Sequence, residues 1–401
     1  MEEEKREEKE EKTGRRRRWL LWGLIVLAVL AAGAFFLSDR FGNMLRSGSH
    51  YTLTKTGATA ELDADGVTMT QAMGDLIVRS NGGGVCGLTA SGGARWDVAY
   101  TMSRPYLLVS GDYAAVADRK GTDVVVVDRS GKNTRIQAEN KILLHAVNEA
   151  GTVAVVTEEA DGHSVTLYSF DGTKLLKRRT YQSQDGTPVA VALSADGKRM
   201  VTACVAYSGL KASSTMTAFD LSASGSTLVD RVLGSKKIEG TLISELHYIG
   251  SYCVYAGDDR IGSLDTASGC KEVWEKELTH RLSAMAYGSD SFAVVLGQGL
   301  AGTAEEPEYN LWIYDAKGTA LVKKKEAGIT ALEAAGDIYV CGGARSYTAV
   351  NLEGETAWFA DTEESYRKIM LLEDHKTAAA QDMTSLTYYK VTELTEEDKN
   401  Q

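Results

Sequence analysis

Short apolar runs separated by glycine-containing turns recur along most of the chain. One kind of turn closes a β-branched or aromatic run and opens another, as in Val127-Asp-Arg-Ser-Gly131 and Leu264-Asp-Thr-Ala-Ser-Gly269. Copies return every ~40 residues, a spacing typical of stacked four-stranded units. They lie at 88–93, 127–131, 169–172, 219–225, 264–269, 313–318 and 350–354.

A second series of tight turns lies inside apolar hairpins, between the copies of the first. Its eight members are at 73–75, 110–112, 149–151, 194–197, 249–251, 287–290, 335–337 and 373–375. Their spacing of ~37 to 53 residues is typical of propeller blades with four strands each. Because the two series alternate, we expect an inner and an outer hairpin in every blade. The strands of the second blade are expected at 106–110, 113–117, 123–127 and 134–137.

The ends of the chain account for the missing eighth outer turn. Leu386–Val391 is interpreted as a third strand with no fourth behind it, and either Tyr51–Thr54 or Ala58–Leu62 can complete that blade. Closure by strands from both termini covers the sheet edges that an open array exposes. The sequence therefore predicts an all-β fold, a β-propeller of eight four-stranded blades, with seven blades as the alternative.

Three segments are harder to interpret. Residues 206–214 and 297–308 lack strand patterning and are rich in small or polar residues, so both are expected to be surface loops. Residues 363–372 could be helical, but they lie in phase with the first strand of the last blade.

The N-terminal segment differs in kind from the rest. Residues 1–18 form a charged tail that ends in four arginines, Arg15, Arg16, Arg17 and Arg18. Residues 19–37 carry no charge and, as a helix, match the hydrocarbon thickness of a bilayer. We interpret them as a transmembrane anchor, with a cleaved signal peptide ending near 32–34 as the alternative. The arginines predict a cytoplasmic N-terminus.

This topology fixes the expected organisation of the chain. A disordered cytoplasmic tail (1–18), a membrane helix (19–37) and a linker (38–50) precede an extracytoplasmic propeller (51–393), and an acidic tail (394–401) follows. The expected location is the cell membrane, crossed once.

Composition agrees with this organisation. Glycine is frequent at 40 residues and proline rare at 3, as tight hairpins require. A net charge of -11 argues against a nucleic-acid partner. The five cysteines form no CxxC pair and are expected to be free and buried, although Cys253 and Cys270 are close enough in sequence for one disulfide.

Tryptophans follow several outer turns: Trp96, Trp274 and Trp358. Leu264-Asp-Thr-Ala-Ser-Gly-Cys-Lys-Glu-Val-Trp274 and 88–96 resemble the repeat of quinoprotein propellers and of the bacterial outer-membrane assembly scaffold propeller. The resemblance, over about 66–391, implies a role for these tryptophans in docking neighbouring blades. The vicinal cysteines of the quinoprotein enzymes are absent, so no quinone cofactor is expected. The overall layout resembles an uncharacterised clostridial-type family of single-pass membrane proteins with a quinoprotein- or WD40-like propeller.

Other candidate chemistry is weak. Asn81-Gly-Gly-Gly84 lacks the lysine and helix of a phosphate loop, and the six histidines show no metal-ligand spacing. We therefore expect no catalytic, cofactor-binding or metal-binding residues. The expected function is a non-enzymatic binding or scaffold module for an unknown envelope protein or glycan. A hydrolase or lyase with a site at the central channel is the alternative, and an envelope sensor subunit is the third.

Overall fold

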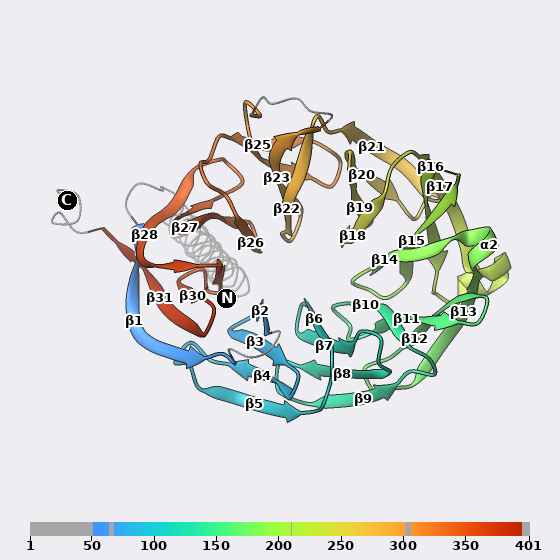
Figure 1. The fold of residues 1–401 in the computed structure, drawn as a ribbon, viewed down its shortest axis with the longest axis horizontal. Helices are drawn as coiled ribbons and strands as arrows, with labels where there is room; N and C mark the ends of the chain where they lie inside the picture. The colour runs from blue at the N-terminus through green and yellow to red at the C-terminus, as the bar shows by residue number, and fades with distance from the viewer. Residues whose placement is uncertain (1–50, 64–67, 210, 301–305, 395–401) are drawn as a thin grey trace, which may run out of the picture. The chain divides into compact units, whose positions relative to one another are not determined.

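A computed structural model describes residues 51–63, 68–209, 211–300 and 306–394. These residues form eight antiparallel sheets arranged around a ring (Figure 1). We number the blades in chain order. Blade 1 comprises β2 (Met69–Met73), β3 (Leu76–Asn81), β4 (Gly84–Leu88) and β5 (Ala94–Ala99). Blade 2 comprises β6 (Pro105–Ser110), β7 (Tyr113–Asp118), β8 (Asp123–Asp128) and β9 (Asn133–Gln137).

The next four blades repeat this order. Blade 3 holds β10 (Ile142–Val147), β11 (Val153–Glu159), β12 (Gly162–Tyr168) and β13 (Lys174–Tyr181). Blade 4 holds β14 (Thr187–Leu193), β15 (Arg199–Ser208), β16 (Lys211–Asp220) and β17 (Val232–Glu239). Blade 5 holds β18 (Ile243–Ile249), β19 (Tyr252–Gly257), β20 (Arg260–Asp265) and β21 (Lys271–Glu277). Blade 6 holds β22 (His280–Tyr287), β23 (Ser291–Gly299), β24 (Leu311–Asp315) and β25 (Ala320–Lys324).

Blade 7 has three elements, β26 (Ala331–Ala335), β27 (Ile338–Val350) and β28 (Thr356–Tyr366). The first part of β27 pairs with β26 and its last part with β28. Between them the backbone doubles back, since a Cβ on Gly342 would lie 2.3 Å from the Ser346 carbonyl oxygen. One long element therefore supplies both middle strands of the blade.

Blade 8 closes the ring. It contains β29 (Lys368–Leu371), β30 (Thr377–Gln381) and β31 (Ser385–Glu393), and its outermost strand is β1 (Tyr51–Glu61). The register runs from Tyr51 opposite Glu393 to Glu61 opposite Ser385, with an irregularity between Lys55 and Thr59. Eight blades and closure by the N-terminal strand are confirmed, and both candidate segments belong to that one strand.

The antiparallel order gives the ring two distinct faces. Turns between the first and second strands, and between the third and fourth, lie at one end of each blade; we call this end the hairpin face. Turns between the second and third strands, and the links to the next blade, lie at the other end; we call it the linker face. Apolar clusters span neighbouring blades, as where Val85 of blade 1 packs in one cluster with Leu107 and Val116 of blade 2. Packing between blades thus forms the core.

The structure corrects one expectation and leaves another outside its range. Residues 206–208 and 211–214 are not a loop, because β15 and β16 continue to pair there, with Ala206 opposite Ser213 and Tyr207 opposite Ala212. An antiparallel ladder needs only backbone groups, so an exposed hairpin forms without an apolar pattern. Of residues 297–308, 297–299 belong to β23 and 301–305 lie outside the described residues.

Residues 363–372 contain the end of β28 and all of β29, the innermost strand of the last blade, as expected. All five cysteines are buried free thiols, including Cys253 and Cys270. Within the described ranges, no helix has the length and apolar character needed to span a bilayer. The apolar run 19–37 and the arginines before it lie outside those ranges.

Candidate functional site

Two of the three singled-out tryptophans contact the outer turn of the following blade. Trp96 of β5 donates a hydrogen bond from Nε1 to the Arg129 carbonyl oxygen at 3.0 Å, and a Cβ on Gly131 would lie 2.6 Å from the Trp96 Cβ. Trp274 of β21 donates to the Ala316 carbonyl oxygen at 3.2 Å, and its ring covers Gly318 in the same way. Each contact joins two adjacent blades, and neither leaves the indole N–H for a ligand.

Trp358 of β28 is the exception. It is only 1 % exposed, and its Nε1 has no hydrogen-bond partner. The blade that follows it is blade 8, where the third strand is the last in the chain and the fourth comes from the N-terminus. That blade has no turn between its third and fourth strands, so the carbonyl that the other two indoles reach is missing. The three tryptophans thus lie at three separate blade junctions and share no site.

Three separate groups of titratable side chains lie on the innermost strands. His145 of β10 lies edge-on to Tyr106 with ring centroids 6.0 Å apart, and burial lowers its pKa to about 4. Glu333 of β26 forms an ion pair with Lys368 of β29 at 2.9 Å. Among the described residues, no hydrogen bond or ion pair links one group to another.

The third group lies on β18 and β22. The ring of His247 stacks on Tyr287 with centroids 4.0 Å apart, and burial lowers the pKa of His247 to about 4. Glu245 stands two residues before His247, so both side chains emerge on the same face of the strand. Glu245 is exposed, yet the surrounding protein desolvates its carboxyl and raises the pKa. Burial raises the pKa of Tyr287 and the charge of Glu245 adds to that shift, so this group brings a carboxyl, an imidazole and a phenol together.

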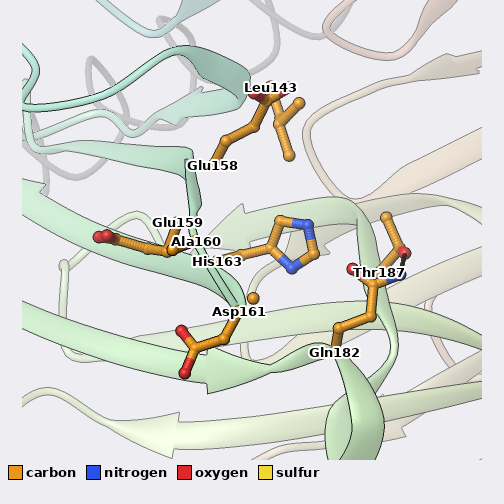
Figure 2. Close-up of a pocket in the computed structure, with 9 residues that line it drawn as sticks. Leu143, Glu158, Glu159, Ala160, Asp161, His163, Gln182 and Thr187 are labelled. Atoms are coloured by element: carbon orange, nitrogen blue, oxygen red, sulfur yellow. Dashed lines mark hydrogen bonds between the residues drawn. The ribbon is translucent and has the colours of Figure 1, made fainter.

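A cavity of about 500 Å³ opens on the linker face at the junction of blades 3 and 4 (Figure 2). We call it the junction cavity. Its lining comes from the start of β10, the end of β11, the turn that follows, the start of β12, a short helix and the start of β14; the residues are Leu143, Glu158, Glu159, Ala160, Asp161, Gly162, His163, Gln182 and Thr187.

Local structure on the blade 4 side is set by the link 182–186. The helix α2 (Gln182–Asp185) is one turn long and ends at Gly186, whose φ of 81° favours glycine. The Asp185 carboxylate accepts a hydrogen bond from the Tyr181 N–H at 2.8 Å, and the Gln182 N–H donates to the Asp161 carbonyl oxygen at 3.2 Å. The second bond ties the link to the turn of blade 3 and holds the two walls of the cavity together.

His163 is the most deeply buried polar side chain of the cavity. It is 6 % exposed, its Nδ1 has no hydrogen-bond partner, and its ring points into the space between the labelled residues (Figure 2). Burial lowers the pKa of His163, while the charge of Glu158 opposes that shift. The imidazole is therefore neutral at neutral pH. An unsatisfied buried nitrogen costs about 1–3 kcal/mol, so a small movement of the ring that brings a donor to Nδ1 is favourable.

Three carboxylates belong to the residues that line the cavity, and the two that point away from the His163 ring in Figure 2, Glu159 and Asp161, are neutralised by β13. Glu159 lies 3.1 Å from the Lys177 ammonium, and Asp161 pairs with Arg179 at 2.8 Å. Glu158 is exposed and has no ion-pair partner among the described residues. Glu158 is directly opposite His163 in the β11–β12 register, which places both side chains on the same face. The cavity therefore presents one uncompensated carboxylate beside a neutral imidazole.

A second hollow, of about 510 Å³, lies on the outer side of the same junction. Arg178 of β13 covers the Phe219 ring with its guanidinium carbon 4.4 Å from the centroid, and Arg231 donates to the carbonyl oxygen of Ser222 at 2.8 Å. Tyr181 and Leu228 also line it and are 43 % and 38 % exposed. The rim of the junction is thus apolar and cationic, in contrast to the acidic cavity.

The third hollow, of about 730 Å³, is on the hairpin face. Arg129 of blade 2 passes over Gly74 of blade 1 and reaches Glu373 of blade 8 at 2.8 Å, while also pairing with Asp112 at 2.7 Å. Glu149 also lines the hollow and has no ion-pair partner among the described residues. The ion pairs of Arg129 join three blades. A structural role accounts for them.

Sequence reasoning did not identify the junction cavity. Within Glu158-Glu-Ala-Asp-Gly-His163 the sequence pattern draws attention only to His163, as one of six scattered histidines. Four acidic or imidazole side chains around one tight turn are a usable signal, but the opposite wall comes from another blade. In the described residues no group of three or more His, Cys, Asp or Glu side chains is arranged to hold a metal ion.

Solved structures of three proteins share this fold at low sequence identity. BamB from Moraxella catarrhalis matches with 14% identity and a TM-score of 0.51, covering 84% of this chain and 99% of its own. Sqt1 from Saccharomyces cerevisiae matches with 13% identity and a TM-score of 0.56, covering 87% and 99%. Sqt1 from Chaetomium thermophilum, bound to the N-terminus of the ribosomal protein L10, matches with 12% identity and a TM-score of 0.56, covering 84% and 99%.

These identities show a common propeller fold and nothing finer. No curated protein matches the chain. A family model matches residues 47–386, which include all but the last strand of the ring. The chain belongs to DUF5711, a family of unknown function.

Proposed function

We propose that this protein is a membrane-anchored binding module whose propeller lies outside the cytoplasm and holds a partner polypeptide on its linker face. The anchor in this proposal is the apolar run 19–37, and Arg15–Arg18 set its orientation. Support for binding comes from the ring itself, which is rigid and offers loops from eight blades on each face.

The observation that carries the proposal is the irregularity of the junction between blades 3 and 4. Five of the eleven large exposed apolar side chains in the described residues come from segment 175–229. Tyr181 and Tyr207 lie toward the linker face, whereas Leu175, Leu228 and Val229 lie toward the hairpin face of the same junction. On the linker face the same segment contains α2 and the extended β15–β16 hairpin, and on the hairpin face it contains two short 3-10 turns. Exposed apolar side chains on insertions in an otherwise regular scaffold are typical of interaction surfaces.

The fold supports this use by analogy. Sqt1 from Chaetomium thermophilum is a propeller that binds the N-terminus of another protein. A ring of this kind can therefore hold an extended polypeptide, and the junction cavity offers this chain a place for one of its side chains.

The test is site-specific photocrosslinking in intact cells with the full chain. A photoreactive residue at Gln182, on the linker face, is compared with one at Ser289, in a turn of the hairpin face. We expect a discrete protein adduct from position 182 and none from 289. Adducts of equal yield at both positions, or none at 182, would contradict the proposal.

The side of the membrane on which the propeller lies needs a separate measurement. Protease added outside intact cells should digest the propeller of the full chain while a cytoplasmic marker survives. Digestion of the propeller only after lysis would overturn the extracytoplasmic placement.

One observation favours an enzyme as a second candidate, a hydrolase or lyase acting at the central channel. Glu245, His247 and Tyr287 bring a carboxyl with a raised pKa next to a neutral imidazole, as general acid catalysis requires. Nitrophenyl esters, glycosides and phosphates offered to the full chain test it. Turnover that is lost in Glu245→Gln would support the candidate, and absence of turnover with every substrate class would count against it.

A further inference from the structure

We propose that the junction cavity receives a lysine or arginine side chain of the partner polypeptide, with Glu158 and His163 as its contacts. This inference rests on the proposed function, because it specifies the chemistry of the partner that the linker face holds. It commits to a cationic polypeptide segment, and the comparison of a charged with an uncharged peptide tests whether the cavity requires the cation.

Charge is the first argument. Glu159 and Asp161 are already paired with cations of β13, whereas Glu158 is not paired with any described cation. An organic cation that enters the cavity meets one free carboxylate, and the two paired ones keep the surrounding potential from becoming positive. A metal ion fits less well, since the described carboxylates and imidazoles do not form a group that could hold one.

Hydrogen bonding is the second argument and is independent of the first. His163 is more than nine-tenths buried, and its Nδ1 is aimed at no protein donor. A neutral imidazole accepts one hydrogen bond and donates one. An ammonium or guanidinium group carries only donors. In the structure Nδ1 is closed off from solvent, so the His163 ring must turn slightly before such a group can donate to Nδ1 and to Glu158 at the same time.

Size and surroundings restrict the occupant to one side chain. A volume of about 500 Å³ suits a lysine or arginine side chain with some water, and it is too small for a folded element. The remainder of the partner then lies over the adjacent surface. Tyr207, at the tip of the β15–β16 hairpin on the same face, is 71 % exposed and offers an apolar contact there.

The experiment is a fluorescence-anisotropy titration of the full chain in detergent micelles, at near-physiological salt so that long-range attraction is screened. The probe is a labelled octapeptide with alternating arginine and glycine, compared with the same peptide in which citrulline replaces arginine. The variants are Glu158→Gln and His163→Phe. Glu149→Gln is the matched control, because it removes the same charge from the hairpin face.

The arginine peptide is expected to bind at least tenfold more tightly than the citrulline peptide. Glu158→Gln should weaken it about tenfold, the loss of one charge-assisted hydrogen bond, and Glu149→Gln should leave it unchanged. His163→Phe should weaken it too, and circular dichroism identifies a variant that has failed to fold. Glu158 is exposed, so Glu158→Gln keeps the test decisive even if His163→Phe unfolds.

Equal binding of the two peptides, or equal effects of Glu158→Gln and Glu149→Gln, would overturn the inference. The crosslinking and peptide-binding results together distinguish failure of this inference from failure of the proposed function. An adduct at Gln182 that forms equally well in Glu158→Gln leaves the binding module standing and removes the cation site. Glu158-dependent peptide binding without any adduct at Gln182 keeps the cation site and removes the partner.

Discussion

The contact between Trp274 and Gly318 provides a quantitative test of how blades are joined. Gly318 has a φ of 88°, and a Cβ there would lie 2.4 Å from the indole of the preceding blade. Gly354 occupies the equivalent turn of blade 7 with a φ of 80°, but its nearest neighbour, Val322, would be 3.4 Å away. The two glycines share the backbone conformation and differ in the space above it, so Gly354→Ala is a matched control for Gly318→Ala.

Left-handed backbone costs an L-residue about 1–2 kcal/mol, which is the full effect expected for Gly354→Ala. Overpacking against the ring adds about 1–3 kcal/mol for Gly318→Ala. Urea unfolding followed by circular dichroism measures both, and Trp274→Leu completes a double-mutant cycle. In the Trp274→Leu background, Gly318→Ala should cost no more than Gly354→Ala. Equal costs for the two alanine variants, or a cost of Gly318→Ala that is unchanged without the indole, would refute a docking role for Trp274.

Three further predictions concern other parts of the ring. Deleting 51–61 removes β1 and uncovers the edge of β31, so we expect oligomers or aggregates by size-exclusion chromatography; a monomer of unchanged stability would contradict closure. Burial lowers the pKa of His145 from 6.5 to about 4, so the unfolded chain binds this proton at a higher pH than the folded chain does. Stability should therefore decline as the pH falls from 6.5 to about 4, less steeply in His145→Gln, and an identical decline in both proteins would refute this origin. All five thiols are buried, and burial raises the pKa of Cys204 to about 11 and that of Cys341 to about 12. Ellman's reagent should thus react with the five cysteines only after denaturation, and rapid reaction of the native protein would contradict their burial.

The architecture follows from local sequence because turn chemistry repeats in every blade. Glycine at the outer turns and the alternation of the two turn series are properties of short segments, and they suffice for the blade count and the closure. The wrong expectation at 206–214 has the same origin. Strand pairing there depends on backbone hydrogen bonds in an exposed hairpin, which leave no apolar pattern to recognise.

The candidate site cannot be predicted from the sequence, for a different reason. Glu158 and His163 meet because of the β11–β12 register, and the cavity exists because Gln182 and Thr187 of the next blade form its other wall. Neither the register nor the distance between blades is encoded in a contiguous motif. The missing hydrogen bond of Trp358 likewise depends on which strand ends the ring and not on the residues around the tryptophan.

The most direct test of a partner-binding linker face is the photocrosslinking yield at Gln182 in intact cells, measured against Ser289 on the opposite face. The account predicts one predominant adduct at 182, reduced by an excess of the arginine peptide, and none at 289. An adduct that forms only at 289 would contradict the account. So would the absence of an adduct at 182 in cells where the full chain is present and folded.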